Sequence, residues 1–269
     1  MLGGRRAGPN CARPASDGLT VVPQDARGNA AAFSAASDDV FGRIAARYDL
    51  LCDLFSLCIH RQWKARVAEV ISREPWNELL DVACGTGDIV LRVLQHEQSR
   101  NAHRIVACDI SPQMLGVAQR RLSQSHPAIE VRCLDAHCLS GVAPDSFDLY
   151  SISLGLKICE RRTVLQEALR VLRPGGRLIV LEASNIPVRW LQNAYLCYMS
   201  ICMPVIGWLA TGGDASAYRY LLRGVREFPT AECLAREIRE LGFQDVSFER
   251  LSLGIVAIHV ARKPSRPNS

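Results

Sequence analysis

The sequence predicts an α/β fold, a doubly wound, mostly parallel seven-stranded sheet with an N-terminal helical lid. Three observations support this prediction. Short apolar runs alternate with helix-length segments, a glycine turn follows the first run, and acidic residues stand where successive runs end. Parallel strands joined by helices are typically continuous apolar runs, because helices cover both faces of the sheet.

Five short apolar runs, near 78–83, 104–109, 129–134, 147–154 and 177–183, have the length of buried strands. Two final strands are expected near 244–251 and 253–262. Helices are expected between the first five runs and again after residue 188. The first three helices are expected near 87–98, 112–124 and 160–172. Ser111 followed by Pro112 is a typical cap and first turn for the second of these helices.

Length and composition predict one globular domain, residues 38–263, between an extension, 1–37, and a short tail, 264–269. The extension is rich in Gly, Ala, Pro, Ser and Arg and has no apolar periodicity, which is typical of disorder. Its arginine-rich, acid-poor character is also compatible with an organellar presequence. Both interpretations of the extension stay open at this point.

Charge and cysteine usage exclude several classes of protein. The formal charge of +5 is mild, lysine occurs only at 64, 157 and 263, and the arginines form no dense run, so no nucleic-acid partner is expected. The 11 cysteines include no CxxC pair and the six histidines no HxxxH pair, which argues against a metal or disulfide framework. Reduced cysteines are therefore expected, as in an intracellular protein.

A glycine turn follows the first expected strand in the segment ELLDVACGTGDIVLRVL, 78–94. The strand contains Asp81, Gly85 and Gly87 form the turn, and a helix begins at Asp88. Glycines permit the tight turn and let a ligand approach the backbone closely. A dinucleotide site would normally have a third glycine three residues later, where this chain has Val90.

Acidic residues follow the next two strands. Asp109 ends the second strand, where a carboxylate typically accepts the ribose hydroxyls of a nucleoside cofactor. Asp135 and Ala136 end the third strand at the same edge, which suits an adenine amino group and ring. With the later LRPGG segment, this series matches the class I S-adenosylmethionine-dependent methyltransferases.

Several ordered motifs resemble the ubiquinone/menaquinone biosynthesis C-methyltransferase family. Residues 40–64, VFGRIAARYDLLCDLFSLCIHRQWK, resemble its opening signature, and the likeness continues through LDVACGTGD, LRPGGRLIVLEAS, SAYRYL, GVREFPTAECLAREIRELGF and LSLGIVAIH. In the opening signature the matching positions are Tyr48, Asp49, Asp53, Ser56, His60, Arg61, Trp63 and Lys64. The resemblance covers residues 38–263.

The resemblance implies methyl transfer from S-adenosylmethionine to a ring carbon of a prenylated quinol. Matching positions imply cofactor contacts at Thr86, Asp109, Asp135, Ala136 and Ser153. An aromatic carbon becomes a good nucleophile when a ring hydroxyl loses its proton, so a base or a phenolate-stabilising cation is expected. No metal is expected.

Three residues are candidates for this catalytic role: Lys157, Tyr48 and His60. Lys157 and Ile158 stand where the family typically has its active-site arginine and asparagine. A lysine keeps the positive charge but lacks the planar set of donors. His60 is alternatively a structural histidine, and Tyr48 alternatively a core residue. Glu182 and Asp214 have equally simple structural explanations, as a paired carboxylate and a helix cap.

The departures at Lys157 and Ile158, with Cys52 and Ala183, leave two alternatives open. One is a methyltransferase for a different small apolar acceptor, and the other is a non-catalytic cofactor-binding subunit of a quinone-biosynthesis complex. A homodimer stays open as well. The apolar segment 190–210 is expected to form a helix and turn over the acceptor pocket, with peripheral membrane contact or a membrane span as alternatives. The expected compartment is the cytoplasm, at the inner membrane surface, or the mitochondrial matrix side.

Overall fold

The computed structural model of the chain describes residue 45 and residues 48–96, 104–123, 129–211 and 216–265. The expectations for the extension, 1–37, for Asp214 and for the tail beyond 265 lie outside these residues. The assignment of 38–263 to a single domain stays a prediction.

The seven strands form one sheet in the order β3-β2-β1-β4-β5-β7-β6, which confirms the predicted fold class. Strands β1 to β5 run parallel to one another, and β7 runs antiparallel to both β5 and β6. The chain moves outward from β1 to β3 and returns to β4 beside β1, so the strand order reverses there. Ligands of open parallel sheets bind outside the carboxyl ends at such a reversal. The strands are β1 (Glu78–Val82), β2 (Arg104–Asp109), β3 (Ile129–Cys133), β4 (Phe147–Ser153), β5 (Leu172–Ala183), β6 (Gln244–Leu251) and β7 (Val256–Arg262).

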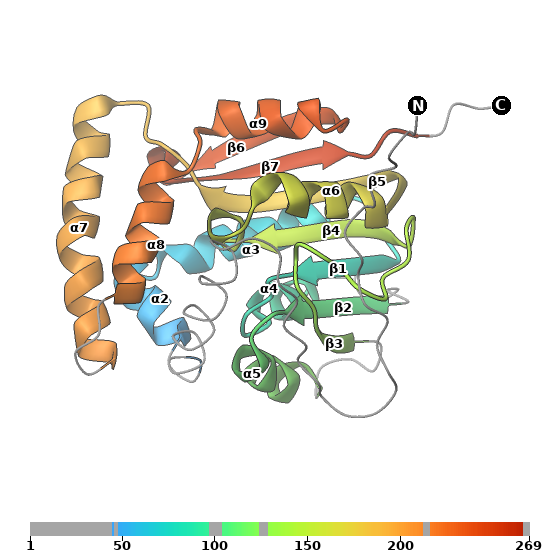
Figure 1. Cartoon of the computed structure of the whole chain (residues 1–269), viewed down its shortest axis with the longest axis horizontal. Helices are drawn as coiled ribbons and strands as arrows, with labels where there is room; N and C mark the ends of the chain where they lie inside the picture. The colour runs from blue at the N-terminus through green and yellow to red at the C-terminus, as the bar shows by residue number, and fades with distance from the viewer. Residues whose placement is uncertain (1–44, 46–47, 97–103, 124–128, 212–215, 266–269) are drawn as a thin grey trace, which may run out of the picture.

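Helices cover both faces of the sheet and one of its edges. Figure 1 shows α2, α7 and α8 beyond the arrowheads of the parallel strands, at the carboxyl edge. The helices are α2 (Tyr48–Ser56), α3 (Ile59–Ile71), α4 (Asp88–Val93), α5 (Pro112–Leu122), α6 (Arg161–Val171), α7 (Arg189–Thr211), α8 (Ser216–Glu227) and α9 (Ala231–Glu240), with short 3-10 turns η3 (Leu156–Ile158) and η4 (Ser252–Gly254).

Alternate residues of the central strands enter two different cores. In β1, Leu79 packs with Trp63 of α3 and Val90 of α4 on one face. Its neighbour Leu80 packs on the opposite face with residues of α6 and α9, including Leu165. Both leucines are fully buried. Successive side chains of a strand point to opposite faces, so a strand covered on both faces is apolar at almost every position.

Strand β5 begins earlier than its apolar run suggests. It extends over Leu172–Ala183, and its pairing with β4 shifts between Phe147 and Leu149. The LRPGG segment, 172–176, therefore lies inside the strand, where it forms an irregularity with Gly175 at a φ of 79°. Glycine adopts this positive φ without the steric cost that a side chain would add.

Helix α7 differs from the helix and turn expected over 190–210. It is a single helix of 23 residues that continues through Pro204. A proline inside a helix removes one backbone hydrogen bond and costs about 3 kcal/mol. Packing offsets this cost, because Met199 and Tyr195 of α7 lie against Leu222 of α8 and Phe55 of α2. None of the helices among the described residues is long and apolar enough to cross a membrane.

The described cysteines agree with the expected reduced state at nine positions and differ at one. Cys138 is disulfide-bonded. The free thiols are Cys52, Cys58, Cys84, Cys108, Cys133, Cys159, Cys197, Cys202 and Cys233. Among the residues that the structure describes, no group of three or more His, Cys, Asp or Glu side chains is arranged to hold a metal ion.

Candidate active site

The glycine turn joins β1 to α4 at the carboxyl edge. Gly85 has a φ of 54° and Gly87 a φ of 78°, so both adopt the left-handed conformation that favours glycine. A Cβ at Gly85 would meet no atom within 4 Å, whereas one at Gly87 would lie 2.9 Å from Leu122 Cδ1 of α5. Gly85 therefore leaves open space for a ligand, and Gly87 lets the turn pack against α5.

Asp109 lies at the end of β2 and is hydrogen-bonded to the glycine turn. Its Oδ2 accepts a hydrogen bond from the Gly85 backbone N–H at 2.8 Å, and its Oδ1 accepts one from the Ser111 N–H at 2.9 Å. These donors fix the carboxylate in one orientation beside the turn. A carboxylate oxygen accepts more than one hydrogen bond, so Asp109 keeps capacity for two vicinal hydroxyls.

Asp135 and Ala136 follow β3 at the same edge, as expected. Asp135 Oδ1 accepts hydrogen bonds from the backbone N–H of His137 at 2.9 Å and from its ring Nδ1 at 2.7 Å. The other ring nitrogen, Nε2, accepts the Glu160 N–H at 2.9 Å, so a neutral ring with its proton on Nδ1 satisfies both contacts. Burial opposes ionisation of Asp135, but the His137 hydrogen bonds outweigh it and lower the pKa of Asp135.

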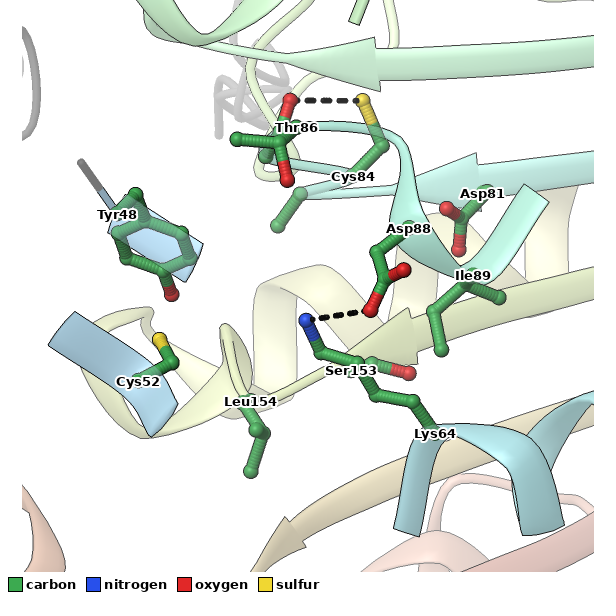
Figure 2. Close-up of a pocket in the computed structure, with 12 residues that line it drawn as sticks. Tyr48, Cys52, Lys64, Asp81, Cys84, Thr86, Asp88, Ile89, Ser153 and Leu154 are labelled. Atoms are coloured by element: carbon green, nitrogen blue, oxygen red, sulfur yellow. Dashed lines mark hydrogen bonds and ion pairs between the residues drawn. The ribbon is translucent and has the colours of Figure 1, made fainter. Parts of the chain in front are cut away.

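A small cavity of about 40 Å³ lies between the glycine turn and the lid helix α2 (Figure 2). It contains two buried polar atoms that make no hydrogen bond with the described residues, Asp81 Oδ2 and Ser153 Oγ. Its lining comprises Tyr48, Cys52, Lys64, Asp81, Ala83, Cys84, Gly85, Thr86, Asp88, Ile89, Ser153 and Leu154.

Asp81 is the most perturbed carboxyl group of this cavity. Its side chain is almost fully buried at the end of β1, and its Oδ1 accepts a hydrogen bond from Ser151 Oγ at 2.5 Å. Burial raises the pKa of Asp81 to about 7, although the Ser151 hydrogen bond acts in the opposite direction. A buried carboxyl group with one unpartnered oxygen is a typical feature of a ligand site.

Helix α2 closes the cavity through polar contacts with the glycine turn. The Thr86 hydroxyl donates to Asp49 Oδ1 at 3.0 Å, and Arg121 of α5 donates from Nη1 to Asp49 Oδ2 at 2.9 Å. The same Arg121 nitrogen also donates to the Thr86 carbonyl at 3.1 Å. The predicted N-terminal lid is thus connected to both the turn and α5.

Two of the three catalytic candidates, Tyr48 and His60, lie in different surroundings. Tyr48 lines the cavity, and proximity to Cys52 together with burial raises its pKa well above the ordinary value, so its phenol stays protonated. His60 lies outside the lining, at the junction of α2 and α3, where Ser56 Oγ is 2.9 Å from its Nδ1. Burial lowers the pKa of His60, so its ring is neutral near pH 7.

Lys157, the third candidate, lies on η3 directly after β4. Its ammonium is 3.3 Å from Oε1 of the fully buried Glu182 and donates to the Leu154 carbonyl. Glu182 also accepts the Lys157 backbone N–H at 3.0 Å and the Ala183 N–H at 2.8 Å. Lys157 lines a second cavity of about 210 Å³ with Arg223 of α8 and with Phe228, which directly follows that helix.

Three side chains that the sequence did not single out for a role contribute to the site, and of these Lys64 lines the cavity. Lys64 is only 8% exposed and pairs with Asp88 Oδ2 at 3.1 Å. Arg121 and His137 orient the lid and Asp135. The sequence signal that could have indicated Lys64 is its position on the core-facing side of an amphipathic helix, where a lysine is rare.

The sheet order, the glycine turn at the strand reversal and the row of acidic strand ends define the fold of a class I methyltransferase. Residues 30–263 match the model of the ubiE/COQ5 methyltransferase family. The chain belongs to this family and is a methyltransferase.

Curated relatives support this membership. The ubiquinone/menaquinone biosynthesis C-methyltransferase UbiE of Paracoccus denitrificans (strain Pd 1222) is 40% identical over 222 residues, which cover 82% of this chain and 87% of that protein. The mitochondrial 2-methoxy-6-polyprenyl-1,4-benzoquinol methylase of Oryza sativa subsp. japonica is 36% identical over 249 residues, which cover 84% of this chain and 82% of that protein.

Solved structures resemble the fold at low sequence identity. A putative methyltransferase in complex with the Trm112 methyltransferase activator of Haloferax volcanii superposes with a TM-score of 0.60 at 15% identity, covering 86% of this chain and 99% of that chain. A methyltransferase from Aquifex aeolicus, described as S-adenosylmethionine-dependent, gives a TM-score of 0.52 at 13% identity, covering 74% and 88%. These similarities establish the fold.

Proposed function

We propose that this protein transfers the methyl group of S-adenosylmethionine to a ring carbon of a prenylated quinol. The observation that carries the proposal is membership of the ubiE/COQ5 family over residues 30–263. The names of the relatives from P. denitrificans and rice, a quinone-biosynthesis C-methyltransferase and a polyprenyl-benzoquinol methylase, support a prenylated quinol as the acceptor.

The carboxyl edge fits an adenosyl cofactor. Asp109 suits the ribose hydroxyls, Asp135 with Ala136 suits adenine, and the unpartnered Asp81 Oδ2 and Ser153 Oγ require polar groups that a bound ligand would supply. When bound, S-adenosylmethionine supplies a methyl group already activated on a sulfonium sulfur. The residues proposed to hold it are Asp81, Gly85, Thr86, Gly87, Asp109, Asp135, Ala136 and Ser153.

The chain must then align the acceptor carbon and stabilise its phenolate. The bound donor would supply the methyl group as its sulfur–methyl bond is exchanged for a carbon–methyl bond, water would take the phenol proton beforehand, and the displaced ring proton would pass to water to restore aromaticity. We assign the stabilising cation to Lys157, which lies three residues after Leu154 of the cofactor cavity and itself lines the second cavity.

Tyr48 and His60 receive different proposed roles. The protonated Tyr48 phenol lines the cofactor cavity and can orient a ligand oxygen as a donor. The geometry of His60 favours a structural role, because its ring contacts Ser56 and lies 3.7 Å from Asp53 at the α2–α3 junction. His60 therefore positions the lid.

A different small acceptor is the second candidate function. It is favoured by one observation, the pair Lys157 and Ile158 at the acceptor side, where isoleucine offers no hydrogen bond. The third alternative, a cofactor-binding subunit without turnover, is an outcome of the same experiment.

Incubation with S-adenosylmethionine and a demethylated prenylated quinol is expected to yield a product methylated at carbon. Mass spectrometry would detect the added methyl group, and NMR of the product would distinguish a carbon-bound from an oxygen-bound methyl. Lys157→Ala is expected to lower kcat by about a hundredfold, the usual effect of losing one stabilising charge. Lys157→Arg keeps the charge and is expected to keep most of the wild-type kcat.

Cofactor binding without methylation of any quinol would favour the cofactor-binding subunit, and O-methylation would favour a different reaction. If Lys157→Ala turned over as fast as the wild type, the assigned role of Lys157 would be incorrect. Arg162→Ala, an exposed arginine near the start of α6, is the control for loss of a surface charge.

We further propose that the outer face of α7 contacts a lipid surface, from which a prenylated acceptor would enter. This face is defined by the exposed residues Trp190, Ala194, Cys197, Tyr198, Ile201, Val205 and Trp208. It has no charged residue, an aromatic residue near each end and the exposed Arg189 beside Trp190, a composition typical of interfacial helices. The rice relative is named mitochondrial, and the matrix side or the bacterial cytoplasm stays the proposed compartment.

Ile201→Glu is expected to reduce binding to vesicles of phosphatidylcholine and phosphatidylglycerol by about tenfold, because it places a charge in the middle of the apolar face. Flotation of the protein with the vesicles measures the bound fraction. Cys233→Glu adds the same charge on an exposed position of α9 and should leave binding unchanged. Equal binding by both variants would contradict the proposed contact.

A further inference from the structure

We propose that Lys64 binds the α-carboxylate of the methyl donor, while the Asp81 and Ser153 side chains of the same cavity receive its amino group. This inference rests on the proposed function and deepens it, because it assigns the amino-acid end of the cofactor to a specific part of the cavity. Lys64 comes from α3, outside the strand ends to which cofactor contacts were assigned.

Lys64 is placed and charged for such a contact. Among the 12 described residues that line the cavity, it alone carries a cationic side chain (Figure 2). Its side chain is 10% exposed, and its ammonium reaches Asp88 Oδ2 at 3.1 Å. An ammonium has three N–H donors, and the Asp88 contact accounts for one of them.

Asp88 does not neutralise Lys64 by itself, because three cations share its carboxylate. Arg92 Nε lies 3.3 Å from Asp88 Oδ2, the same oxygen that Lys64 contacts, and Arg121 Nη2 lies 3.8 Å from Oδ1. Arg121 also pairs with Asp49 Oδ2 at 2.9 Å, so the group holds three cations and two carboxylates and keeps one excess positive charge. An anionic group of a ligand would be attracted to the one cation of this group that lines the cavity.

The same cavity also contains hydrogen-bond acceptors, which have the complementary character. Asp81 Oδ2 and Ser153 Oγ are buried acceptors without a hydrogen-bond partner among the described residues, and an ammonium group can donate to both at once. A ligand with adjacent ammonium and carboxylate groups would therefore satisfy Asp81 and Ser153 with the first and Lys64 with the second. The α-amino acid end of the methyl donor has this chemistry.

The test compares two adenosyl ligands by calorimetry. S-adenosylhomocysteine carries the carboxylate, and S-adenosyl-thiopropylamine keeps the amine but lacks it. The wild type is expected to bind the first at least tenfold more tightly. Lys64→Met, which keeps the aliphatic stem, should weaken S-adenosylhomocysteine binding by about tenfold to a hundredfold and leave the second ligand within about threefold.

Arg92→Met is the matched control. It removes another cation from Asp88 Oδ2 without touching the cavity lining, so it should keep the wild-type preference for the carboxylate. Thermal unfolding without ligand shows whether each variant folds. Lys64→Arg, which retains the charge, replaces Lys64→Met if the latter does not fold, and is then expected to retain part of the preference.

Each outcome decides between the hypotheses. If Lys64→Met weakened both ligands equally, or changed neither, the inference would be wrong while the proposed function would stand. If the wild type bound neither ligand, the inference and the proposed cofactor would fail together. Calorimetric binding without quinol methylation would leave the Lys64 inference intact and overturn only the proposed reaction.

Discussion

Asp81→Asn is expected to stabilise the ligand-free protein at pH 8 and to have little effect near pH 4. Burial raises the pKa of Asp81 to about 7 in the folded protein, against an ordinary value of 3.8. Between these two values the unfolded chain releases the proton and the folded chain keeps it, so the stability of the wild type falls as the pH rises. A difference of this size corresponds to roughly 4 kcal/mol at pH 8.

Asparagine is neutral at every pH and can still accept the Ser151 hydrogen bond, so the variant should lack this loss of stability. Urea unfolding at pH 4, 6 and 8 measures the free energy of unfolding of both proteins. Asp88→Asn is the control with the opposite sign. Burial of Asp88 is outweighed by its ion pairs, first of all that with Lys64, which lower its pKa. That variant should therefore lose stability at neutral pH.

If the free energies of unfolding of the wild type and of Asp81→Asn differed by the same amount at pH 4 and at pH 8, the raised pKa of Asp81 would be contradicted. Cofactor binding gives a second readout, because a ligand ammonium beside Asp81 would favour the ionised carboxylate. Binding of S-adenosylhomocysteine near pH 7 is then expected to release protons, which calorimetry in buffers of different ionisation enthalpy would measure.

Asp109→Ala is expected to weaken S-adenosylhomocysteine binding by at least about a hundredfold. The substitution removes the proposed acceptor of two ribose hydroxyls, and hydrogen bonds to a charged group contribute about 1.5–3 kcal/mol each. It also leaves the Gly85 and Ser111 N–H groups without their partner, which loosens the glycine turn. Calorimetry gives the affinity, and a ligand-free melting curve reports the effect on the fold.

Two matched variants separate these contributions. Asp109→Asn keeps an oxygen for one backbone N–H, so its loss of affinity reflects mainly the ribose contact. Asp135→Ala should cost less, about tenfold, because the Asp135 side chain is 45% exposed and solvent competes for its contacts. Unchanged affinity in Asp109→Ala would mean that the ribose lies elsewhere.

Most of the sheet could be predicted from the sequence because burial on both faces leaves a direct trace in composition. The five apolar runs and the two further expected strands correspond to the seven strands, and residues that end parallel strands necessarily meet at one edge. This reasoning brought Asp81, Asp109 and Asp135 together without knowledge of the fold. The start of β5 was missed because Pro174 and Gly175 have turn chemistry, yet the chain stays in the sheet through a shift in register.

Contacts between distant segments could not be predicted in the same way. The Thr86–Asp49–Arg121 connection joins residues far apart in the sequence, and no local pattern encodes which face of α2 turns toward the glycine turn. No local pattern assigns a role to Lys64 either, because it is the packing of α3 against α4 that buries it beside Asp88.

The sequence by itself determined the mostly parallel, doubly wound type of sheet, the glycine turn and the acidic residues at the strand ends, because local periodicity and strand length follow from near neighbours. Only the tertiary structure decided where the ammonium groups point. Lys157 turns toward Glu182 and the Leu154 carbonyl, while Lys64 reaches into the cofactor cavity. The physical reason is that a long, flexible side chain is oriented by the partners it finds in the folded protein, and those partners come from other strands and helices.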